Sequence, residues 1–539
     1  MTWWKKAVIY QIYPRSFQDS NGDGIGDIPG IISRLDYLQH LGIRAIWLCP
    51  VYASPNDDNG YDVSNYLAIH PDFGTMDDMD RLIEEARKRD IRIIMDLVVN
   101  HSSDEHQWFI ESKSSTDSPY RDYYIWRDPV DGKEPNDLKS FFGGSAWEFD
   151  EDSGQYYLHL FSKKQPDLNW ENKDMRMDTY DMIKTWLDKG IGGFRLDVID
   201  LIGKKPDEKI LGNGPKMFDY IEEMNRESFG QYDAMTVGEI WGARPENAAD
   251  YADPNKDRFS KVLMFEHLTL DEEPGKPKWD LAELDFVQLK KVFNHWQTNM
   301  PKGVWTGLFW NNHDTPRIVS RFGNDGEYRE ESAKMLAILL HMMKGTPYIY
   351  QGEEIGMTNH PISDISQARD IETLNLYHER LNQGYSKEDI FQSIHAKGRD
   401  NARTPMQWEA SEQGGFTTGT PWIDVNENIT QVNVESNLED PNTVFHTYRK
   451  LIQLRNEHAI ITEGDFELVM EDHPQLFAYE RSYKDQTWLV VANFSDAVCE
   501  VDLSENKTDS KVILSNTGKT DYDLSHVRLE PYETFVVEK

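Results

Sequence analysis

The sequence predicts an α/β protein: a (β/α)8 barrel with a loop-rich segment inserted after the third strand and an antiparallel β domain at the C-terminus. Short apolar runs that suit buried parallel strands recur eight times, and segments of helical periodicity separate several of them. Beyond residue 463 the pattern changes to short alternating runs, such as 487–492, which indicate antiparallel strands. The chain of 539 residues is long enough for these parts.

The predicted barrel strands are short and apolar. In chain order they are 7–13, 45–49, 92–99, 193–198, 235–239, 262–265, 307–310 and 347–350. Apolar residues at helical spacing indicate helices over 28–41, 79–88 and 175–189, and Gly42 ends the first of these. A strand, a helix and the next parallel strand form a right-handed unit, and its repetition closes a barrel.

Composition divides the chain into four segments. Residues 1–101 and 171–462 carry the strands and helices of the barrel. Residues 102–170 are rich in Asp, Ser, Tyr and Gly without a clear helical period, which predicts an inserted domain of loops. Residues 463–539 form the predicted C-terminal β-sandwich domain.

Charge and cysteine content restrict the partners and the compartment. The formal net charge is −37 at pH 7, and such a field repels phosphate backbones and anionic lipids, so we expect neither nucleic-acid nor membrane partners. The two cysteines, Cys49 and Cys499, give no disulfide framework, and neither a secretory leader nor a membrane span is expected. We therefore expect a cytoplasmic protein, monomeric, that acts on a small molecule.

The strand over 193–198 carries two charges. Arg195 and Asp197 lie within an apolar run, where charges are rare unless they pair or take part in chemistry, so both a structural ion pair and a catalytic carboxylate fit. Asp96, Glu239 and Asp314 also lie at or just beyond the C-terminal ends of predicted strands, where a barrel places its active site. Four acids on one rim repel one another, so a purely structural role for them would be costly. Cleavage of a glycosidic bond, in contrast, needs two such acids.

A polar loop follows the first strand. Side-chain oxygens at alternate positions, with glycines between them, suggest an oxygen cage for calcium. Its ligands would be Asp19, Asn21, Asp23, the carbonyl of Ile25 and Asp27. An EF-hand needs a glutamate at the twelfth position of such a loop, where Gly30 stands, so no EF-hand is expected. A polar Asx-turn loop that caps the next helix is the alternative.

Five ordered motifs resemble those of the α-amylase family of retaining glycoside hydrolases. Four of them are 96–101 (DLVVNH), 193–197 (GFRLD), Glu239 and 311–314 (NNHD). The fifth, 165–170 (QPDLNW), resembles a region of the oligo-1,6-glucosidase branch of that family. The resemblance extends over essentially the whole chain, and the family's structural calcium loop matches residues 19–27.

The resemblance implies a role for each residue of the motifs. Asp197 would be the nucleophile, kept ionised by Arg195, and Glu239 would be the general acid and then the base. Asp314 would bind sugar hydroxyls and favour the distorted ring. His101 and His313 would hold hydroxyls of the same glucose unit, and a hydrogen-bonded structural role is the alternative for either histidine taken alone.

The same resemblance implies a pocket closed behind the non-reducing end of the substrate. Tyr61 would stack under the terminal glucose, and Asp58 would bind its far hydroxyls. Arg399 would pair with Asp58 and close the pocket, which makes the enzyme exo-acting. Phe142 and Gln165, from the inserted segment, would line the same pocket.

Two further residues bear on the leaving sugar. Val198 follows the predicted nucleophile, and its branched side chain would narrow the entrance beside the scissile bond. In the resembled family valine here accompanies α-1,6 specificity, although a role in strand packing is the alternative. Trp241 would floor the next sugar site, or pack in the core.

The resemblance thus implies hydrolysis of α-1,6-glucosidic bonds in isomaltose, panose, isomalto-oligosaccharides and dextran fragments. A transglycosylase or sucrose isomerase would share the same acids but exclude water. A trehalose-6-phosphate hydrolase would need a cationic phosphate site, and no basic cluster adjoins the motifs. A binding protein without activity is disfavoured, because all three predicted catalytic acids are present.

Overall fold

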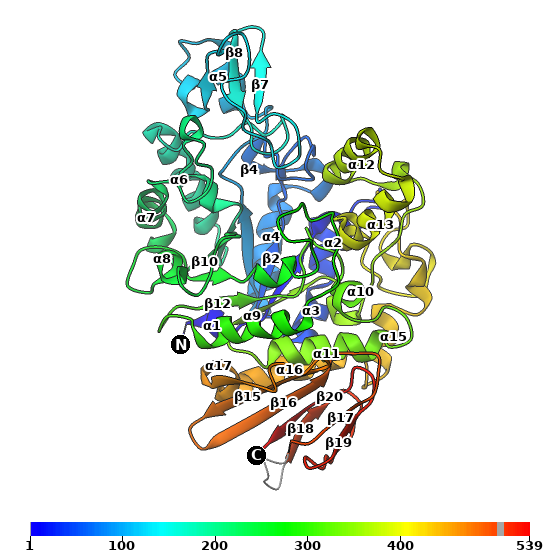
Figure 1. The fold of residues 1–539 in the computed structure, drawn as a ribbon. Coiled ribbons are helices and arrows are strands. Elements are labelled where there is room, and N and C mark those ends of the chain that lie inside the picture. The colour runs from blue at the N-terminus through cyan, green and yellow to red at the C-terminus, as the bar shows by residue number, and fades with distance from the viewer. Residues whose placement is uncertain (1, 504–510) are drawn as a thin grey trace.

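A closed barrel of parallel strands forms the centre of the molecule, in a computed structural model that describes residues 2–503 and 511–539 (Figure 1). Around the barrel the strands follow the order β1-β13-β12-β11-β10-β9-β5-β2. Their bounds are β1 (Ile9–Ile12), β2 (Ala45–Leu48), β5 (Arg92–Leu97), β9 (Gly193–Leu196), β10 (Met235–Gly238), β11 (Lys261–Leu263), β12 (Thr306–Leu308) and β13 (Thr346–Tyr350). The predicted barrel is confirmed, and each predicted strand overlaps one of these eight.

Helices surround the barrel. Between its strands lie α2 (Ile28–Ser33), α3 (Leu35–Leu41), α4 (Met76–Lys88), α6 (Lys173–Asp188), α7 (Met217–Glu227), α8 (Ala248–Ala252), α9 (Phe286–Thr298), α10 (Ile318–Phe322) and α11 (Arg329–His341). The short α1 (Trp3–Lys6) precedes β1, and the helices after β13 are α12 (Ile371–Gln383), α13 (Lys387–Lys397), α14 (Asp400–Arg403), α15 (Val434–Glu439), α16 (Val444–Glu457) and α17 (Ala459–Glu463). Among the described residues, none of these helices has the length and apolarity needed to cross a membrane.

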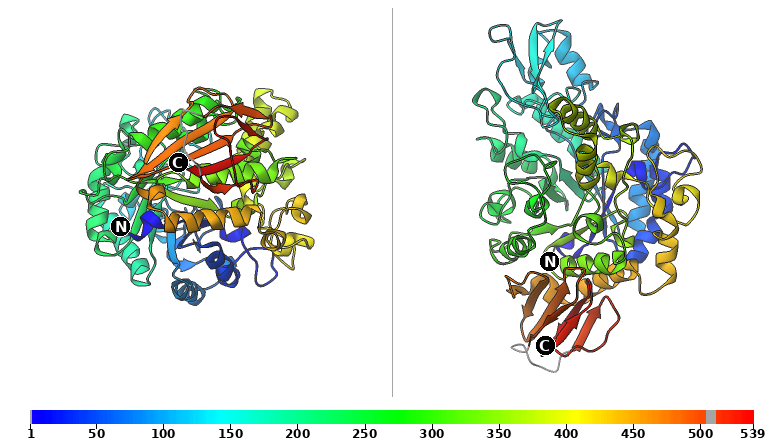
Figure 2. Two further views of the ribbon diagram at one scale, coloured as in Figure 1. Left: turned by 90° about the horizontal axis from the view of Figure 1, so that it is seen from below. Right: turned by 45° about the vertical axis from the view of Figure 1, so that its right-hand side comes forward.

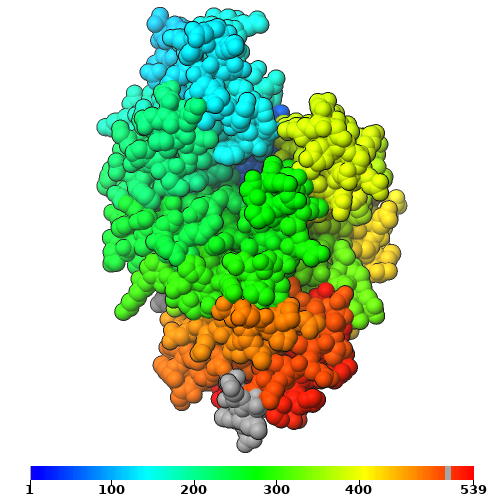
Figure 3. Space-filling view, viewed as in Figure 1, coloured from blue at the N-terminus to red at the C-terminus, as the bar shows by residue number. Residues whose placement is uncertain are grey.

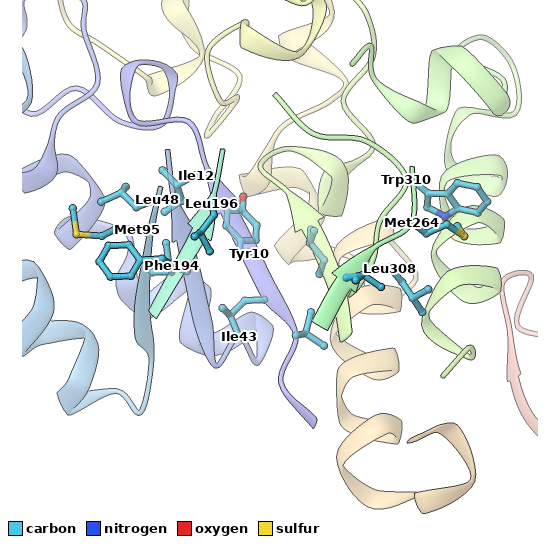
Figure 4. Packing of buried hydrophobic residues seen from close by; sticks show 14 of the residues in the cluster. Tyr10, Ile12, Ile43, Leu48, Met95, Phe194, Leu196, Met264, Leu308 and Trp310 are labelled. Carbon is cyan, nitrogen blue, oxygen red and sulfur yellow. The ribbon is translucent and has the colours of Figure 1, made fainter. Parts of the chain in front are cut away.

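Alternation along β9 explains why charges are tolerated in it. Phe194 and Leu196 belong to the buried apolar cluster that also contains residues of the surrounding helices. Figure 4 shows both side chains with Tyr10 and Leu48 of the same cluster. Successive side chains of a strand point to opposite faces, so Arg195 points to the barrel interior. The strand begins at Gly193, where φ is +142° and a Cβ atom would lie 1.8 Å from a carbonyl oxygen of β10. Only glycine allows the two strands to approach this closely.

The helix predicted over 28–41 is wrong in one respect, because two helices occupy the range. Arg34 separates α2 from α3 with φ −105° and ψ 5°. Its guanidinium lies over the Trp408 ring at 4.0 Å and donates to Gln18 Oε1 at 2.7 Å. Trp408 is distant in sequence and Gln18 lies in the loop before α2, so the apolar spacing within the helix gave no signal of the break.

The inserted segment contains a small sheet in the order β6-β8-β7 and one helix, α5 (Gln107–Ser114). The strands are β6 (Trp126–Arg127), β7 (Trp147–Asp150) and β8 (Gln155–Leu158), and a separate hairpin before it pairs β3 (Tyr52–Ala53) with β4 (Asn65–Ile69). The segment that was predicted to be rich in loops also contains the helix α5, for which the sequence shows no clear period. That helix buries only Phe109 and Ser112, so it shows no apolar period, and the His106 side chain caps its first turn.

Two antiparallel sheets form the C-terminal part, at the opposite end of the molecule from the inserted sheet (Figure 2). The larger has the order β14-β15-β16-β20-β18, and the smaller pairs β17 with β19. The bounds are β14 (Asp465–Val469), β15 (Leu476–Tyr483), β16 (Gln486–Asn493), β17 (Cys499–Val501), β18 (Lys511–Ser515), β19 (Val527–Leu529) and β20 (Thr534–Glu538). One apolar cluster joins both sheets and includes Cys499, Leu489 and Phe535. The domain boundaries given above stay predictions.

Candidate active site

One arginine holds three carboxylates at the C-terminal ends of neighbouring strands. Arg195 lies opposite Asp96 in the register of β5 and β9, and Asp197 and Glu239 directly follow β9 and β10. Arg195 Nη1 lies 2.8 Å from Asp96 Oδ1 and 2.7 Å from Asp197 Oδ1, and Nη2 lies 2.5 Å from Glu239 Oε2. All four side chains are buried. The guanidinium therefore brings the predicted nucleophile and the predicted acid side by side.

The charges of this group depend on one another. Burial alone lowers the pKa of Arg195, but Asp96, Glu239 and Asp197 raise it well above its ordinary value, so the guanidinium stays charged. Burial raises the pKa of Asp197, and Arg195 opposes that rise by favouring the ionised carboxylate. Asp96 is held further by hydrogen bonds from Tyr61 at 2.8 Å and Trp47 at 3.1 Å.

A second group of charges surrounds Asp314. Arg399 Nη1 lies 3.2 Å from Asp314 Oδ1, and Arg403 Nη2 lies 3.0 Å from the same atom. Arg399 Nη2 also lies 3.1 Å from Asp58 Oδ1 and 2.6 Å from Asp370 Oδ1. Burial alone would raise the pKa of Asp314, but His313 and the two guanidinium groups hold it well below its usual range. Asp314 therefore stays ionised.

Sequence reasoning missed Asp370 and Arg403. Asp370 caps α12 and is fully buried, and nothing in its local sequence indicates a partner. Arg403 follows Arg399 by four residues, a spacing that puts two side chains on the same face when the segment is helical, as it is in α14. This spacing is a signal that could have found Arg403.

His313 is neutral at pH 7 and fixed by its neighbours, and it becomes charged only at the low pH at which Asp314 would take up a proton. Burial lowers the pKa of His313 to about 3. Its ring stacks on Tyr61 with centroids 5.3 Å apart and an angle of 10° between the ring planes. Gln11 Nε2 lies 2.8 Å from His313 Nδ1, and His313 Nε2 lies 3.1 Å from Asp314 Oδ2. Because Gln11 can donate to Nδ1, the ring proton belongs on His313 Nε2, which lies near Asp314 but makes no hydrogen bond within the described residues.

Gln165 connects the inserted segment to the same pocket. Its Nε2 lies 3.2 Å from Asp58 Oδ2, 3.1 Å from the Tyr61 carbonyl oxygen and 3.2 Å from His101 Nε2. Burial lowers the pKa of His101 to about 4 and raises that of Asp58 to about 7 against the effect of Arg399. All of these predicted pocket residues thus lie together.

The second group of charges, around Asp314 and Arg399, borders a cleft of about 440 Å³. Figure 3 shows the surface hollowed where the cyan inserted segment, the green segment and the yellow segment meet. The cleft is lined by Asp314, Arg399, Val198, Trp241 and Phe142 of the predicted residues, and by Phe141, Phe161, Asp200, Leu201, Leu268, Thr269, Glu272, Lys278, Thr315, Pro316, Arg321, Glu372 and Lys397. Trp241 is 45% exposed, packs on Phe265 and donates to Glu239 Oε1 at 3.0 Å.

Val198 adopts a conformation that is rare for its type. The strand ends at Leu196, and Val198 lies in the left-handed region with φ 35° and ψ 43°. A β-branched residue there is strained by about 1–3 kcal/mol, so its surroundings must hold it. Its backbone N–H donates to Glu239 Oε2 at 3.2 Å. The sharp turn lets Val198 line the cleft beside Asp197 instead of continuing the strand.

Hydrogen bonds to its own backbone organise the loop predicted to hold calcium. Asp19, Asn21 and Asp23 each accept from the N–H two residues further along, at 2.9 Å. Asp27 caps α2 by accepting from Gly30 N at 2.6 Å. Within 2–503 and 511–539, no three His, Cys, Asp or Glu side chains are grouped as metal ligands. The Asx-turn alternative accounts for these bonds, and calcium stays a prediction.

Comparisons with known proteins agree with the predicted resemblance. The family described as alpha amylase, catalytic domain, matches residues 11–464, and the alpha-amylase SusG C-terminal domain matches residues 476–536. A glucan 1,6-α-glucosidase of Streptococcus pneumoniae serotype 4 is 57% identical over 540 residues, which are 99% of each chain. An oligo-1,6-glucosidase of Parageobacillus thermoglucosidasius is 53% identical over 99% of this chain and 98% of its own.

Solved structures give the same result. A crystal structure of trehalose-6-phosphate hydrolase from Bacillus licheniformis superposes with a TM-score of 0.95 at 48% identity and covers 100% of both chains. The match therefore includes the barrel, the inserted segment and the C-terminal sheets. The chain belongs to the α-amylase family of glycoside hydrolases.

Proposed function

We propose that this protein is an exo-acting, retaining α-glucosidase that hydrolyses α-1,6-glucosidic bonds from the non-reducing end of isomaltose, panose, isomalto-oligosaccharides and dextran fragments. The observation that carries the proposal is the single guanidinium of Arg195, which holds Asp197 and Glu239 side by side, next to the cleft-lining Val198. Retaining glycosidases need two carboxyl groups about 5–5.5 Å apart, with one positioned for direct attack.

The proposal assigns a residue to each step of the hydrolysis. The Asp197 carboxylate attacks the anomeric carbon while protonated Glu239 gives its proton to the leaving oxygen, which breaks the glycosidic bond and leaves a glycosyl ester. Glu239 then takes a proton from water, and the water oxygen displaces Asp197 from the sugar. Asp314, Asp58, His101 and His313 provide hydrogen-bonding groups for the sugar hydroxyls.

The closed end of the cleft supports exo action. Arg399 joins Asp58, Asp314 and Asp370 in one buried group, and the Phe142 ring lies 5.4 Å from its guanidinium carbon. A chain cannot extend through this group, so the pocket accepts a terminal glucose.

Val198 supports the α-1,6 preference. An α-1,6 bond adds a methylene and one rotatable torsion, so the leaving sugar can move clear of the valine branch, whereas an α-1,4 bond holds the second ring closer. One such contact contributes about 1–3 kcal/mol of discrimination. The two relatives above carry α-1,6 specificity in their names.

A trehalose-6-phosphate hydrolase is the second candidate, because such an enzyme matches over the full chain. Against it, the cations that line the cleft are already paired with carboxylates. Lys278 lies 2.6 Å from Glu372 Oε2, and Lys397 lies 2.6 Å from Asp271 Oδ1. A free cation for the phosphate is therefore lacking among the described cleft residues.

We also propose that the enzyme is a monomer and works in the cytoplasm. The cysteines are free and buried, which suits a reducing compartment, and a monomer would elute at about the chain mass of 62.8 kDa in size-exclusion chromatography.

A product panel tests the function. The pure protein is incubated with isomaltotriose, maltotriose, sucrose and trehalose 6-phosphate, and NMR follows the first minutes. We expect α-glucose as the first product of isomaltotriose and little reaction with the other three. β-Glucose as first product would refute the retaining mechanism, isomerised sucrose would indicate an isomerase, and preferred cleavage of trehalose 6-phosphate would favour the second candidate.

A further inference from the structure

Asp200 borders the cleft but takes no part in the steps above. It lies two residues after Val198, in the 3-10 turn η4 (Ile199–Leu201), and both residues line the cleft with Trp241. The Asp200 carbonyl accepts from Asn213 N at 2.8 Å, which fixes the turn. Because Val198 and Trp241 mark the open side of the cleft, the Asp200 carboxylate faces the space that the leaving group must occupy.

The Asp200 carboxylate has no cationic partner among the described residues, and this sets it apart from the other charges of the cleft. Besides the lysine pairs described above, Arg321 Nη2 lies 2.6 Å from Asp271 Oδ1, and Arg399 binds three aspartates. Every cation that lines the cleft is thus neutralised by a carboxylate of the protein. The charge of Asp200 is left uncompensated on the leaving-group side.

Burial and the neighbouring Glu239 carboxylate together raise the pKa of Asp200 to about 7. The same two causes decide which ligands suit the site. Hydroxyl groups that donate to the carboxylate replace the water it lost and stabilise it, whereas a second negative charge on the open side of the cleft is repelled.

We propose that Asp200 is a specificity-determining residue on the leaving-group side of the cleft, where it accepts hydroxyl hydrogens of a neutral sugar and disfavours leaving groups that carry a phosphate or a carboxylate. The inference rests on the proposed function and extends it. It assigns the preference for neutral leaving sugars to one residue, through charge.

The test compares a neutral with an anionic leaving group. Asp200→Asn keeps the size of the side chain and removes its charge. The substrates are 4-nitrophenyl α-glucoside and 4-carboxyphenyl α-glucoside. The readout is the ratio of their kcat/KM values at low and at high salt, at a pH above 8, where Asp200 is ionised. Asp219→Asn is the control, because it removes one charge from the exposed face of α7, which does not line the cleft. Differences in leaving-group chemistry cancel when each variant is compared with the wild type.

We expect Asp200→Asn to lower the neutral-to-anionic ratio by about tenfold at low salt, because one charge at contact range is removed. The wild-type ratio should fall as salt rises, whereas the ratio of Asp200→Asn should hardly change. Asp219→Asn should behave as the wild type. Asp200→Ser provides a second variant, should the asparagine variant fail to fold.

An unchanged ratio in both Asp200 variants, or a wild-type ratio that does not respond to salt, would overturn the proposal. Failure of the proposed function is seen separately, since the wild type would then fail to cleave isomaltose, whatever its action on 4-nitrophenyl α-glucoside. A loss that is equal for both aryl glucosides would show that Asp200 only supports the fold.

Discussion

The two ends of the cleft hold their charged groups in different ways. At the closed end, Arg399 and Arg403 join the carboxylates of Asp58, Asp314 and Asp370 in one buried group. The open end carries the exposed rings of Trp241 and Phe141, the strained Val198, and Asp200, which has no cationic partner in the part of the chain that the structure describes. The closed end is therefore organised in advance for one sugar, and the open end distinguishes leaving groups by shape and charge. Changes at the closed end should affect all substrates alike, and changes at the open end should alter ratios between substrates.

The largest expected effect comes from substitution of Asp197, because the proposed reaction of every substrate depends on it. Asp197→Asn keeps the shape but removes the nucleophile, so kcat should fall by at least about 10⁴-fold on isomaltose and on 4-nitrophenyl α-glucoside. Added azide should restore cleavage of the aryl glucoside and give the β-glucosyl azide, since azide then enters from the face that Asp197 occupied. An asparagine variant with near wild-type kcat would rule out Asp197 as the nucleophile.

Arg399→Lys is the test of the closed end. Lysine keeps the charge but cannot reach three carboxylates at once, and disturbing a buried charge pair costs about 3–5 kcal/mol. We expect kcat/KM to fall at least about 100-fold on both substrates, with a lower melting temperature. Arg369→Lys is the matched control, because its guanidinium in the same region binds backbone carbonyls of Trp422 and Ser366. A change confined to one substrate would break the distinction between the two ends.

Val198→Ala tests the open end. Removing the branch should raise maltose cleavage relative to isomaltose cleavage by about tenfold, within the range for one apolar contact. Val198→Ile keeps the branch and should keep the wild-type ratio. The linkage hypothesis is contradicted if the wild type cleaves maltose as well as isomaltose, or if alanine changes both rates by the same factor.

Removal of a metal ion from the loop over 19–27 should leave the activity that depends on either end of the cleft unchanged. If the loop over 19–27 holds calcium, a strong chelator should lower the melting temperature by a few degrees while kcat/KM stays within about twofold, because binding adds only to native stability. Asp23→Asn, in the exposed part of the loop, should reduce that shift. Elemental analysis that finds no bound metal, together with an unchanged melting temperature, would favour the Asx-turn loop.

The sequence predicted the barrel strand over 193–196 better than it predicted the helices. The strand over 193–196 was predictable, because its apolar alternation and its glycine start are local properties. The 3.6-residue spacing over 28–41 predicted one helix, but contacts of Arg34 with Trp408 and Gln18 interrupt it. In α5 the reverse holds, since a helix with two buried residues has no period to detect.

Local sequence patterns were sufficient to predict the barrel and the acidic residues on its rim. Period-two alternation forces Arg195 inward between Phe194 and Leu196, and the ends of parallel strands meet at one face, so Asp197 and Glu239 had to lie together. These conclusions need only local patterns and the geometry of a closed sheet.

The family resemblance implied the pair of Arg399 with Asp58, but only the three-dimensional arrangement of the loops explains it and the pairs that no motif indicated. Arg399 and Asp58 are 341 residues apart and meet because their loops converge above the barrel. The partnership with Asp370, the left-handed turn at Val198 and, within residues 2–503 and 511–539, the lack of a cation beside Asp200 arise in the same way. Ion pairing depends on distances of a few ångströms between side chains from different loops, and no local sequence pattern encodes those distances.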